Sequence, residues 1–517
     1  MDDADATDRS QEAASRSPTT QPNILLLMTD QQRFDSLAAY GFSGGHTPNL
    51  DRLARDGVVF DRCYATSPIC TPSRASLMTG HHLPGHGVFG IYDVLPDDQV
   101  LFPDRLRDLG YQTALVGKLH VSSLHEEALR RHPHDGFDTY DWCVEGCVAM
   151  DSPYQAYARW LQDVAPEFRE RLARDGRDVT HQPAELHMAT WAADRTIERL
   201  ENRDRTRPFF IMMSLFDPHD PYDSYPLASA AGIVPEEMPP RLPRTRGKAA
   251  EPVAIDRERN RNYLGTASAM PPAELRALRR DYHASISFVD EQVGRVLDHV
   301  DRLGLRDDTM VVFCSDHGDM LGDHDLLGKG AFFYEPSVRV PLLLRWPGRV
   351  PAGHRVTGPV QLNDLASTIL HAAGVPEAQR RAWMPDSRTL MPAASGAEDG
   401  PRDAAVCAYR NSGVSADGPW DPPIHATMLC DGNAKLNLYH DGAGPGGRTG
   451  YQLFDLERDP DEANDLSAEP SERARALNML QRLLDWEAAH ERRLGTRGGR
   501  RLAPPGHRRQ NALKPRD

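Results

Sequence analysis

Residues 23–31 read NILLLMTDQ, an unbroken apolar run that ends in Thr29, Asp30 and Gln31. A continuous run of this kind is typical of a strand covered on both faces, as in a parallel sheet. Four more runs have the same character, and amphipathic segments with helical spacing lie between them. The predicted strands are residues 23–28, 113–116, 209–215, 310–314 and 341–344, and the predicted helices are residues 49–55, 104–109 and 288–303. Strands and helices in alternation predict an α/β fold with a doubly wound, mostly parallel sheet flanked by helices.

This sheet is expected to occupy only part of the chain. Residues 1–20 are polar and have nothing to bury, which is typical of a disordered tail. Residues 491–517 are basic; a flexible tail is the simpler interpretation, and an electrostatic docking arm is the alternative. The predicted units are a tail over 1–20, a large domain over 21–385, a small C-terminal antiparallel α+β subdomain over 386–490 and a tail over 491–517. The subdomain is expected to contain strands in 429–439 and 451–456 and a helix at about 471–490.

Two polar segments interrupt the alternation of strands and helices. They are residues 145–185 and residues 223–265, the second of which is rich in Pro and Arg. Both are expected to leave the sheet, and the second could form a rim or lid over a binding site.

The composition is that of a soluble globular protein, with 39% hydrophobic and 26% charged residues. The 60 Lys and Arg stand against 75 Asp and Glu, a net charge of −15 that argues against nucleic acid as a partner. No apolar run approaches the roughly 20 residues of a membrane helix, and residues 1–20 lack the apolar core of a secretory signal. Seven scattered cysteines, an odd number, indicate free thiols. We therefore expect a cytoplasmic protein that binds neither membrane nor nucleic acid; a homo-oligomer is left open.

Polar side chains follow four of the predicted strands. They are Asp30 and Gln31, Lys118 and His120, Asp217 and His219, and Asp316 and His317. In a doubly wound sheet, ligands bind beyond the carboxyl ends of the strands, although any single strand-end Asp could instead be a helix cap. Lys118 and His120 would share one face of an extended segment, where they could hold an anion while a proton moves.

Two of these pairs form an oxygen-rich set with one imidazole. Asp30, Gln31, Asp316 and His317 together suit a hard divalent cation, and the imidazole widens the choice toward manganese. Adjacent residues in a strand point to opposite faces, so both members of a pair can reach one ion only where the chain has already left the strand.

The most specific segment is CTPSRASLMTG, residues 70–80. Pro72 fits the first turn of a helix, which places Cys70 at a helix N-terminus, where the dipole favours anions. Arg74 lies one turn further on and can point back toward Cys70. A buried structural cysteine and a thiolate nucleophile of low pKa are two other interpretations of Cys70.

This segment resembles the signature of the type I sulfatases, Cys-x-Pro-x-Arg followed by x-x-Leu-x-Thr-Gly. Other blocks resemble that family in the same order, over roughly residues 22–470: PNILLLMTDQ, HTPNLDRLARDGVVFDRCY, YQTALVGKLH, RPFFIMMSLFDPHDPY, DTMVVFCSDHGDMLGDHDLLGKG and YQLFDLERDPDEANDLS. The resemblance implies an alkaline-phosphatase-like fold, with residues 21–385 as the catalytic domain.

The resemblance also implies a chemistry and a set of roles. A formylglycine-generating enzyme would oxidise Cys70 to the aldehyde formylglycine, whose hydrate attacks the sulfur of a small-molecule sulfate ester and then collapses to release sulfate. Asp30, Gln31, Asp316, His317 and the modified Cys70 would bind one divalent metal, Ca²⁺ first, with Mn²⁺ or Mg²⁺ as alternatives. Arg74 would hold the hydrate, Lys118 and Lys329 would grip the anion, His120 would act as base, and His219 would serve the leaving oxygen.

The chain departs from the common family pattern at several positions. Many members have Asp where Gln31 stands and Asn where His317 stands; the present pair is similar to the branch with choline sulfatases and phosphonate monoester hydrolases. Members often place Asn where Ile91 stands, and Tyr92 could substitute for it. A phosphonate monoester or phosphodiester hydrolase is therefore the alternative function, and a non-catalytic binding protein is a third.

Overall fold

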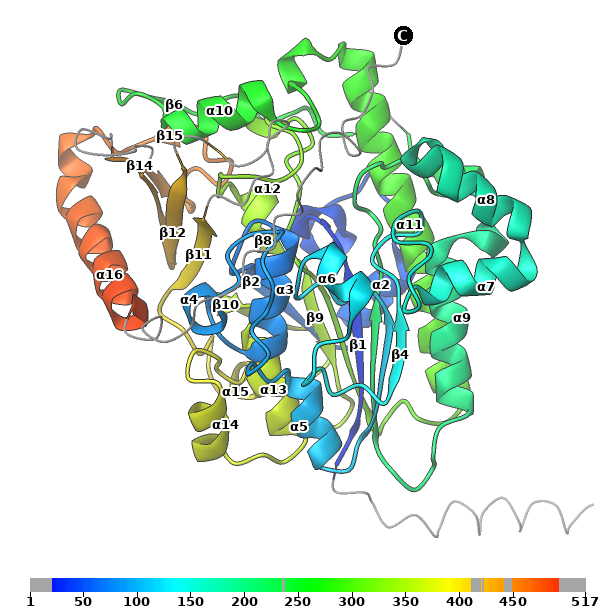
Figure 1. The fold of residues 1–517 in the computed structure, drawn as a ribbon. Coiled ribbons are helices and arrows are strands. Elements are labelled where there is room, and N and C mark those ends of the chain that lie inside the picture. The colour runs from blue at the N-terminus through cyan, green and yellow to red at the C-terminus, as the bar shows by residue number, and fades with distance from the viewer. Residues whose placement is uncertain (1–20, 235–237, 411–419, 421–422, 441–448, 492–517) are drawn as a thin grey trace, which may run out of the picture.

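β1 (Asn23–Thr29) is the buried strand that the opening run predicts, and it lies in the middle of a nine-stranded sheet (Figure 1). The structure is a computed structural model that describes residues 21–234, 238–410, 420, 423–440 and 449–491. The tail predicted over 1–20 lies outside the described residues, as does the tail over 491–517 except for residue 491.

The sheet has the order β10-β2-β9-β7-β1-β5-β3-β4, with β8 paired to β2. Its other strands are β2 (Val58–Tyr64), β3 (Gln112–Gly117), β4 (Thr139–Trp142), β5 (Phe209–Ser214), β7 (Thr309–Ser315), β8 (Arg339–Val340), β9 (Leu342–Arg345) and β10 (His354–Gln361). β1 pairs in parallel with both β5 and β7, so that Leu26 stands between Met212 and Val312. β9 alone in the central path runs antiparallel to both of its neighbours, a direction that an apolar run cannot reveal.

Alternate residues of β1 face the two helical layers of Figure 1. Leu25 and Leu27 belong to the apolar core under α2, α9 and α11, and Ile24 and Leu26 belong to the core under α3, α5 and α13. These helices are α2 (Pro48–Arg55), α3 (Cys70–Thr79), α5 (Phe102–Asp108), α9 (Met188–Glu201), α11 (Pro272–Arg302) and α13 (Asp364–Ala372). The doubly wound α/β architecture is confirmed.

The remaining helices lie at the edges of this core or in the connections. They are α4 (Leu83–His86), α6 (Leu124–Leu129), α7 (Ala156–Val164), α8 (Pro166–Asp175), α10 (Val253–Arg261), α12 (Glu335–Val338), α14 (Glu377–Trp383) and α15 (Met391–Ala394). The two predicted excursions contain α7 and α8 in the first and α10 in the second. Both are partly helical connections outside the sheet.

A four-stranded antiparallel sheet follows in the C-terminal part, in the order β11-β12-β13-β14. Its strands are β11 (Ala405–Arg410), β12 (His425–Asp431), β13 (Ala434–His440) and β14 (Thr449–Asp455), and α16 (Arg473–Glu491) packs on it. The strand predicted across 429–439 is wrong in one respect, because a turn at Gly432, with φ 56°, divides it between β12 and β13. The boundary of this unit at residue 386 stays a prediction.

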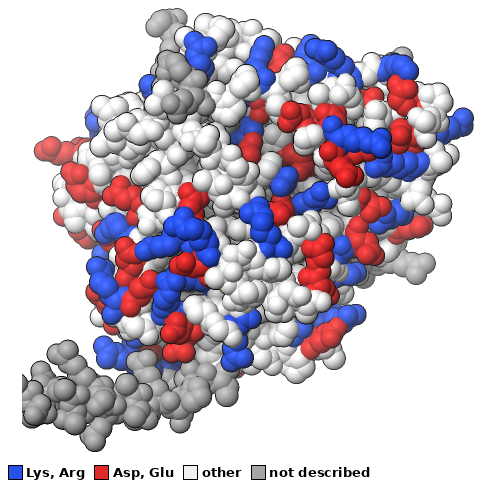
Figure 2. All heavy atoms as spheres, turned by 180° about the vertical axis from the view of Figure 1, so that it is seen from behind, with Lys and Arg blue, Asp and Glu red and all other residues white. Residues whose placement is uncertain are grey.

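Acidic and basic side chains are interspersed on the face of the molecule that Figure 2 shows. Across the described ranges, no helix is both long and apolar enough to span a bilayer. All seven cysteines are free thiols, and six of them, including Cys70, are buried.

Candidate active site

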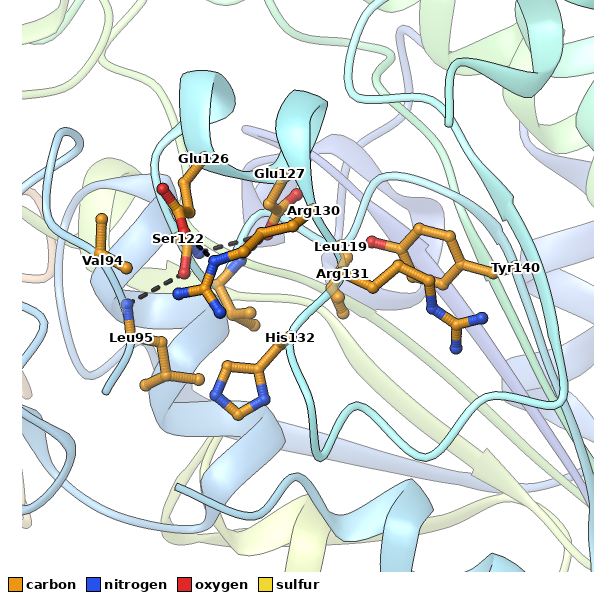
Figure 3. A pocket seen from close by; sticks show the side chains of 11 residues that line it. Val94, Leu95, Leu119, Ser122, Glu126, Glu127, Arg130, Arg131, His132 and Tyr140 are labelled. Atoms are coloured by element: carbon orange, nitrogen blue, oxygen red, sulfur yellow. Dashed lines mark hydrogen bonds and ion pairs between the residues drawn. The ribbon is translucent and has the colours of Figure 1, made fainter. Parts of the chain in front are cut away.

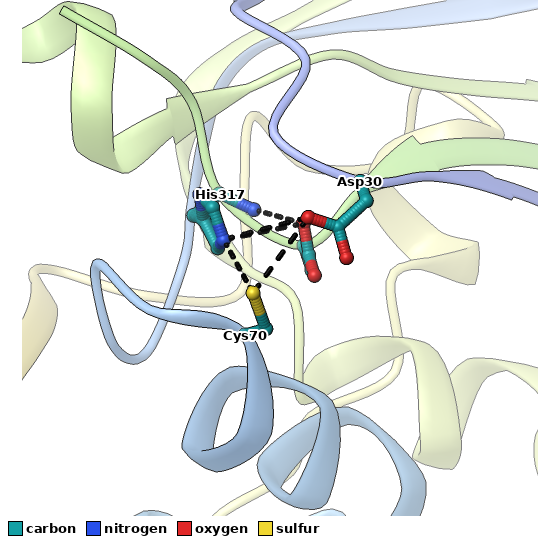
Figure 4. A group of neighbouring side chains, drawn as sticks. Asp30, Cys70 and His317 are labelled. Carbon is teal, nitrogen blue, oxygen red and sulfur yellow. Dashed lines mark hydrogen bonds and ion pairs between the residues drawn. The ribbon is translucent and has the colours of Figure 1, made fainter. Parts of the chain in front are cut away.

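The Cys70 thiol, at the first residue of α3, points toward Asp30 and His317 (Figure 4). Its Sγ atom is 3.1 Å from His317 Nε2, 3.7 Å from Asp30 Oδ1 and 2.9 Å from Lys329 Nζ. Burial opposes ionisation of this thiol, but the positive charges of Lys118 and Lys329 and the His317 ring hold its pKa well below the usual range. The structure therefore places Cys70 in surroundings that favour an anion.

Four of the predicted metal ligands form one buried group. Asp30, Cys70, Asp316 and His317 each offer a ligand atom, and these atoms lie within 4.8 Å of one another. β1 ends at Thr29 and β7 ends at Ser315, so both pairs follow their strands and the two members of a pair can turn to the same point. Carboxylate oxygens with one imidazole nitrogen are a donor set that fits a divalent cation.

Gln31 has its amide oriented by three neighbours. Its Oε1 accepts a hydrogen bond from Lys329 Nζ at 2.9 Å, while its Nε2 donates to Asp319 Oδ2 at 2.5 Å and to Asp220 Oδ1 at 3.3 Å. The residue adopts a left-handed conformation with φ 66°, a bend in the main chain directly after Asp30. The amide oxygen thus lies beside the lysine that also contacts Cys70.

Arg74, one turn into α3, forms ion pairs with both carboxylates of the cluster. Its Nη2 donates to Asp30 Oδ2 at 3.0 Å and its Nε donates to Asp316 Oδ2 at 2.6 Å. Its Nη1 donates to the Lys118 carbonyl and to the Ser214 hydroxyl. Although burial opposes it, these carboxylates raise the pKa of Arg74, which stays charged.

Lys118 and His120 reach the cluster from the end of β3. Lys118 Nζ lies 2.6 Å from Asp30 Oδ2, and His120 Nε2 lies 3.1 Å from Thr71 Oγ1. The segment is not extended as predicted, because His120 has φ 57°. Burial and the charge of Lys118 lower the pKa of His120 to about 4, so the ring is neutral near pH 7 and can accept a proton.

Glu127 fixes the main chain around His120, and no sequence pattern indicates it. This buried carboxylate accepts hydrogen bonds from the backbone N–H groups of His120 at 3.0 Å and Val121 at 2.7 Å, and from the Trp142 indole at 2.8 Å. Glu127 also lines a cavity of about 10 Å³ (Figure 3). None of the predicted site residues lines this cavity, which has room for about one water molecule.

Lys329 and His219 form the remaining side of the cluster. The three protons of an ammonium group meet three acceptors here: Gln31 Oε1 at 2.9 Å, Cys70 Sγ at 2.9 Å and His219 Nε2 at 2.7 Å. His219 Nδ1 lies 2.8 Å from the Asp220 carbonyl oxygen. That carbonyl can only accept, which places a proton on Nδ1 and leaves Nε2 to accept from Lys329.

The two excursions meet at Asp220, next to His219. Arg177, from the first, donates to Asp220 Oδ2 at 3.3 Å and is oriented by two further hydrogen bonds that it donates to the Glu145 carboxylate. Tyr263, from the second, donates to Asp220 Oδ1 at 2.8 Å. The sequence indicates the excursions but not this junction. The Ile91 carbonyl accepts a hydrogen bond from Thr71, the residue after Cys70, whereas Tyr92 is 48% exposed.

The predicted catalytic and metal-binding residues are all buried in this one cluster. Comparisons with known proteins identify the family. The sulfatase family model matches residues 22–375. The choline-sulfatase of Rhizobium meliloti (strain 1021) is 31% identical over 87% of this chain and 83% of its own length. A multifunctional alkaline phosphatase superfamily protein of Trinickia caryophylli is 29% identical over 91% of this chain and 96% of its own.

A solved structure gives the same picture of the fold. The crystal structure of the phosphonate monoester hydrolase of Agrobacterium radiobacter superposes with a TM-score of 0.73 at 27% identity, over 91% of this chain and 96% of that one. The sheet, the helical layers and the C-terminal antiparallel sheet are thus an alkaline-phosphatase-like fold.

Proposed function

The chain belongs to the sulfatase family of sulfuric ester hydrolases, and on this premise we propose that it cleaves a small-molecule sulfate monoester with a nucleophile made from Cys70. The single observation that carries this proposal is the contact of Cys70 Sγ with both Lys329 and His317 at the start of α3. A structural cysteine would need no ammonium group and no imidazole on its sulfur. The maturation partner would be a formylglycine-generating enzyme.

The residues around Cys70 divide into those that hold the sulfate and those that move protons. When oxidised, Cys70 would supply an aldehyde hydrate with one hydroxyl to attack sulfur and a second to open the route for sulfate release. Lys118, Lys329 and Arg74 would neutralise the charge of the sulfate group, because their cationic groups surround the position of the Cys70 side chain. His120, neutral near pH 7, would take the proton of the second hydroxyl.

His219 would serve the leaving alcohol. Its Nδ1 is fixed by the Asp220 carbonyl, and its Nε2 lies inside the cluster beside Lys329, so a protonated His219 ring could donate from Nε2 to the leaving oxygen while Lys329 keeps its charge. A divalent cation, Ca²⁺ first and Mn²⁺ or Mg²⁺ as alternatives, would supply positive charge that stabilises the transition state. Asp30, Gln31, Asp316, His317 and the modified Cys70 would hold it. The proposal is supported by the ligand atoms of Asp30, Cys70, Asp316 and His317, which lie within 4.8 Å of one another.

The test is expression with and without a formylglycine-generating enzyme. The converted protein should hydrolyse 4-nitrophenyl sulfate, and its peptide containing Cys70 should show the thiol-to-aldehyde mass change. Cys70→Ala should be folded and inactive, whereas Cys63→Ala, another buried thiol, should keep its activity. Active protein with an unmodified Cys70 thiol would refute the mechanism, and elemental analysis of the same sample identifies the metal.

A second function, hydrolysis of phosphonate monoesters or phosphodiesters, is favoured by two specific observations. Gln31 and His317 replace the more common Asp and Asn, and a phosphonate monoester hydrolase shares the fold at 27% identity. Rates on 4-nitrophenyl sulfate and 4-nitrophenyl phenylphosphonate, measured on one sample, separate the two. A dominant phosphonate rate would reverse our order of preference.

A further inference from the structure

A second polar cavity lies outside the catalytic cluster, in the excursion over 223–265. It has a volume of about 410 Å³, within the range of small-molecule sites. The residues that line it include three arginines, Arg241, Arg244 and Arg246, and one acidic residue, Asp325. We call this cavity, lined by residues 241–246 and Asp325, the arginine groove.

Positive charge in the arginine groove is only partly neutralised. Asp325 Oδ atoms lie 3.3 Å from Arg241 and 3.5 Å from Arg244, so two lining arginines share one carboxylate. Arg246 makes no ion pair with any residue that the structure describes. Three lining arginines against one lining carboxylate leave two positive charges, in a chain whose net charge is −15.

The guanidinium groups are available to a ligand. The Arg241 and Arg244 side chains are 45% and 53% exposed, whereas Asp325 is 10% exposed and lies beneath them. A guanidinium presents paired N–H donors that match two oxygens of a sulfate or carboxylate group. The groove is therefore suited to an anion and poorly suited to a cation.

One loop connects the arginine groove with the catalytic cluster. Asp325 precedes Lys329 by four residues, so their Cα atoms are at most about 14 Å apart. The same excursion that forms the groove also contributes Asn262, which donates to the Lys329 carbonyl at 3.4 Å, and Tyr263, which donates to Asp220 beside His219. Groove and cluster are thus built from the same two segments.

We propose that the arginine groove binds a second anionic group, a sulfate or carboxylate, carried by the same molecule whose sulfate ester is cleaved. This inference rests on the proposed function. The substrate class is then a polyanionic molecule such as a short oligosaccharide with more than one acidic group, whose length can span the distance between Asp325 and Lys329.

The test compares a polyanion with a single anion. A dextran sulfate oligosaccharide and inorganic sulfate are used as inhibitors of 4-nitrophenyl sulfate hydrolysis by the converted, metal-loaded enzyme. In Arg244→Ala/Arg246→Ala the inhibition constant of the oligosaccharide should rise about tenfold, since two exposed ion pairs are together worth about that factor. The inhibition constant of inorganic sulfate and the kcat/KM for 4-nitrophenyl sulfate should not change. The matched control is Arg381→Ala, an arginine with a side chain 76% exposed on α14.

Calorimetric binding of the same oligosaccharide to Cys70→Ala separates this inference from the proposed function, because it needs no turnover. A tenfold weaker affinity after the two groove substitutions supports the groove even if 4-nitrophenyl sulfate is not hydrolysed. Unchanged oligosaccharide affinity, or an equal loss in Arg381→Ala, overturns it. So does loss of an inorganic sulfate site in the groove variant, which would mean that the groove binds a free anion.

Discussion

Replacing Gln31 by Glu tests whether this position must carry an amide rather than the carboxylate common in the family. The change substitutes an oxygen for the nitrogen that donates to Asp319 at 2.5 Å and to Asp220 at 3.3 Å. The other oxygen keeps its contact with Lys329 at 2.9 Å. Gln31→Glu therefore converts two hydrogen bonds into two contacts between like charges.

The size of the penalty follows from these distances. At an effective dielectric constant of about 20, the two repulsions amount to about 7 and about 5 kcal/mol, and the attraction to Lys329 offsets about 6. Near neutral pH, protonation of the introduced carboxylate costs less free energy than the net repulsion between the charges. It costs about 1.4 kcal/mol for each pH unit above the ordinary Glu pKa of about 4.3, hence about 4 kcal/mol at pH 7 and about 1 at pH 5.

The introduced carboxyl group should therefore have a raised pKa in the folded state. A carboxyl group with a raised folded-state pKa binds its proton more tightly in the folded protein, so stability is lost as the pH rises above about 4.3. Relative to wild type, the free energy of unfolding of Gln31→Glu should fall by about 1.4 kcal/mol per pH unit from pH 5 to pH 8.

The assay is urea unfolding followed by tryptophan fluorescence, in the presence of a chelator so that no cation screens the new charge. Gln31→Glu/Asp319→Asn is the matched control, because the amide introduced at 319 can donate to the carboxylate introduced at 31. It should recover most of the stability at pH 7. A loss that does not depend on pH, or a double variant no more stable than the single one, would refute the reasoning.

Three further substitutions test other parts of the site. Glu127→Gln weakens the charge-assisted hydrogen bonds from the N–H groups of His120 and Val121. It should lower the free energy of unfolding by about 2 kcal/mol and lower kcat on 4-nitrophenyl sulfate about tenfold. Unchanged kinetics would show that Glu127 does not position His120. Burial raises the pKa of Glu258, which accepts the Ala331 N–H, from 4.5 to about 7, so wild type should lose up to about 3 kcal/mol of stability as the pH rises from 4.5 to 8. In Glu258→Gln this pH-dependent loss should be absent, which urea unfolding at pH 6 and pH 8 measures. A free energy of unfolding with the same pH dependence as wild type would contradict the prediction. Arg74→Ala leaves Asp30 and Asp316 buried without their shared cation. It should lower the free energy of unfolding by about 3–5 kcal/mol, and Arg74→Lys should partly restore this stability. Equal losses in the two variants would indicate that packing, not charge, is decisive.

The centre of the sheet could be predicted from the sequence because its strands are buried on both faces. β1, β5 and β7 read as continuous apolar runs for that reason. β4 and β10 could not be predicted in this way, since they lie at the two edges of the sheet and include partly exposed residues. The direction of β9 was equally inaccessible, because burial sets its composition and pairing sets its direction.

Most of the proposed site residues could be predicted because they follow strand ends or belong to a helix-start motif, whereas Lys329 does neither and is indicated by the family resemblance alone. Asp220 and Asp319 could not, because their side-chain partners are distant in the sequence, and Glu127 could not, because its partners near His120 are main-chain N–H groups, which every residue but proline has. Such partners leave no local pattern. The left-handed conformation of His120 shows the same limit, since an extended segment was the natural prediction for Lys118 and His120.

The surroundings of Cys70 also bear on the choice between the two proposed functions. Sulfate monoesters and phosphonate monoesters both carry one negative charge, so the cations of the cluster do not separate them. They differ in that a phosphonate presents a carbon substituent where a sulfate presents an oxygen. The groups around Cys70 Sγ are an ammonium, an imidazole and a carboxylate, and each of them interacts better with an oxygen or a cation than with a hydrocarbon group. The polar lining therefore favours the sulfate ester. An apolar substituent on phosphorus would have to point away from these three groups.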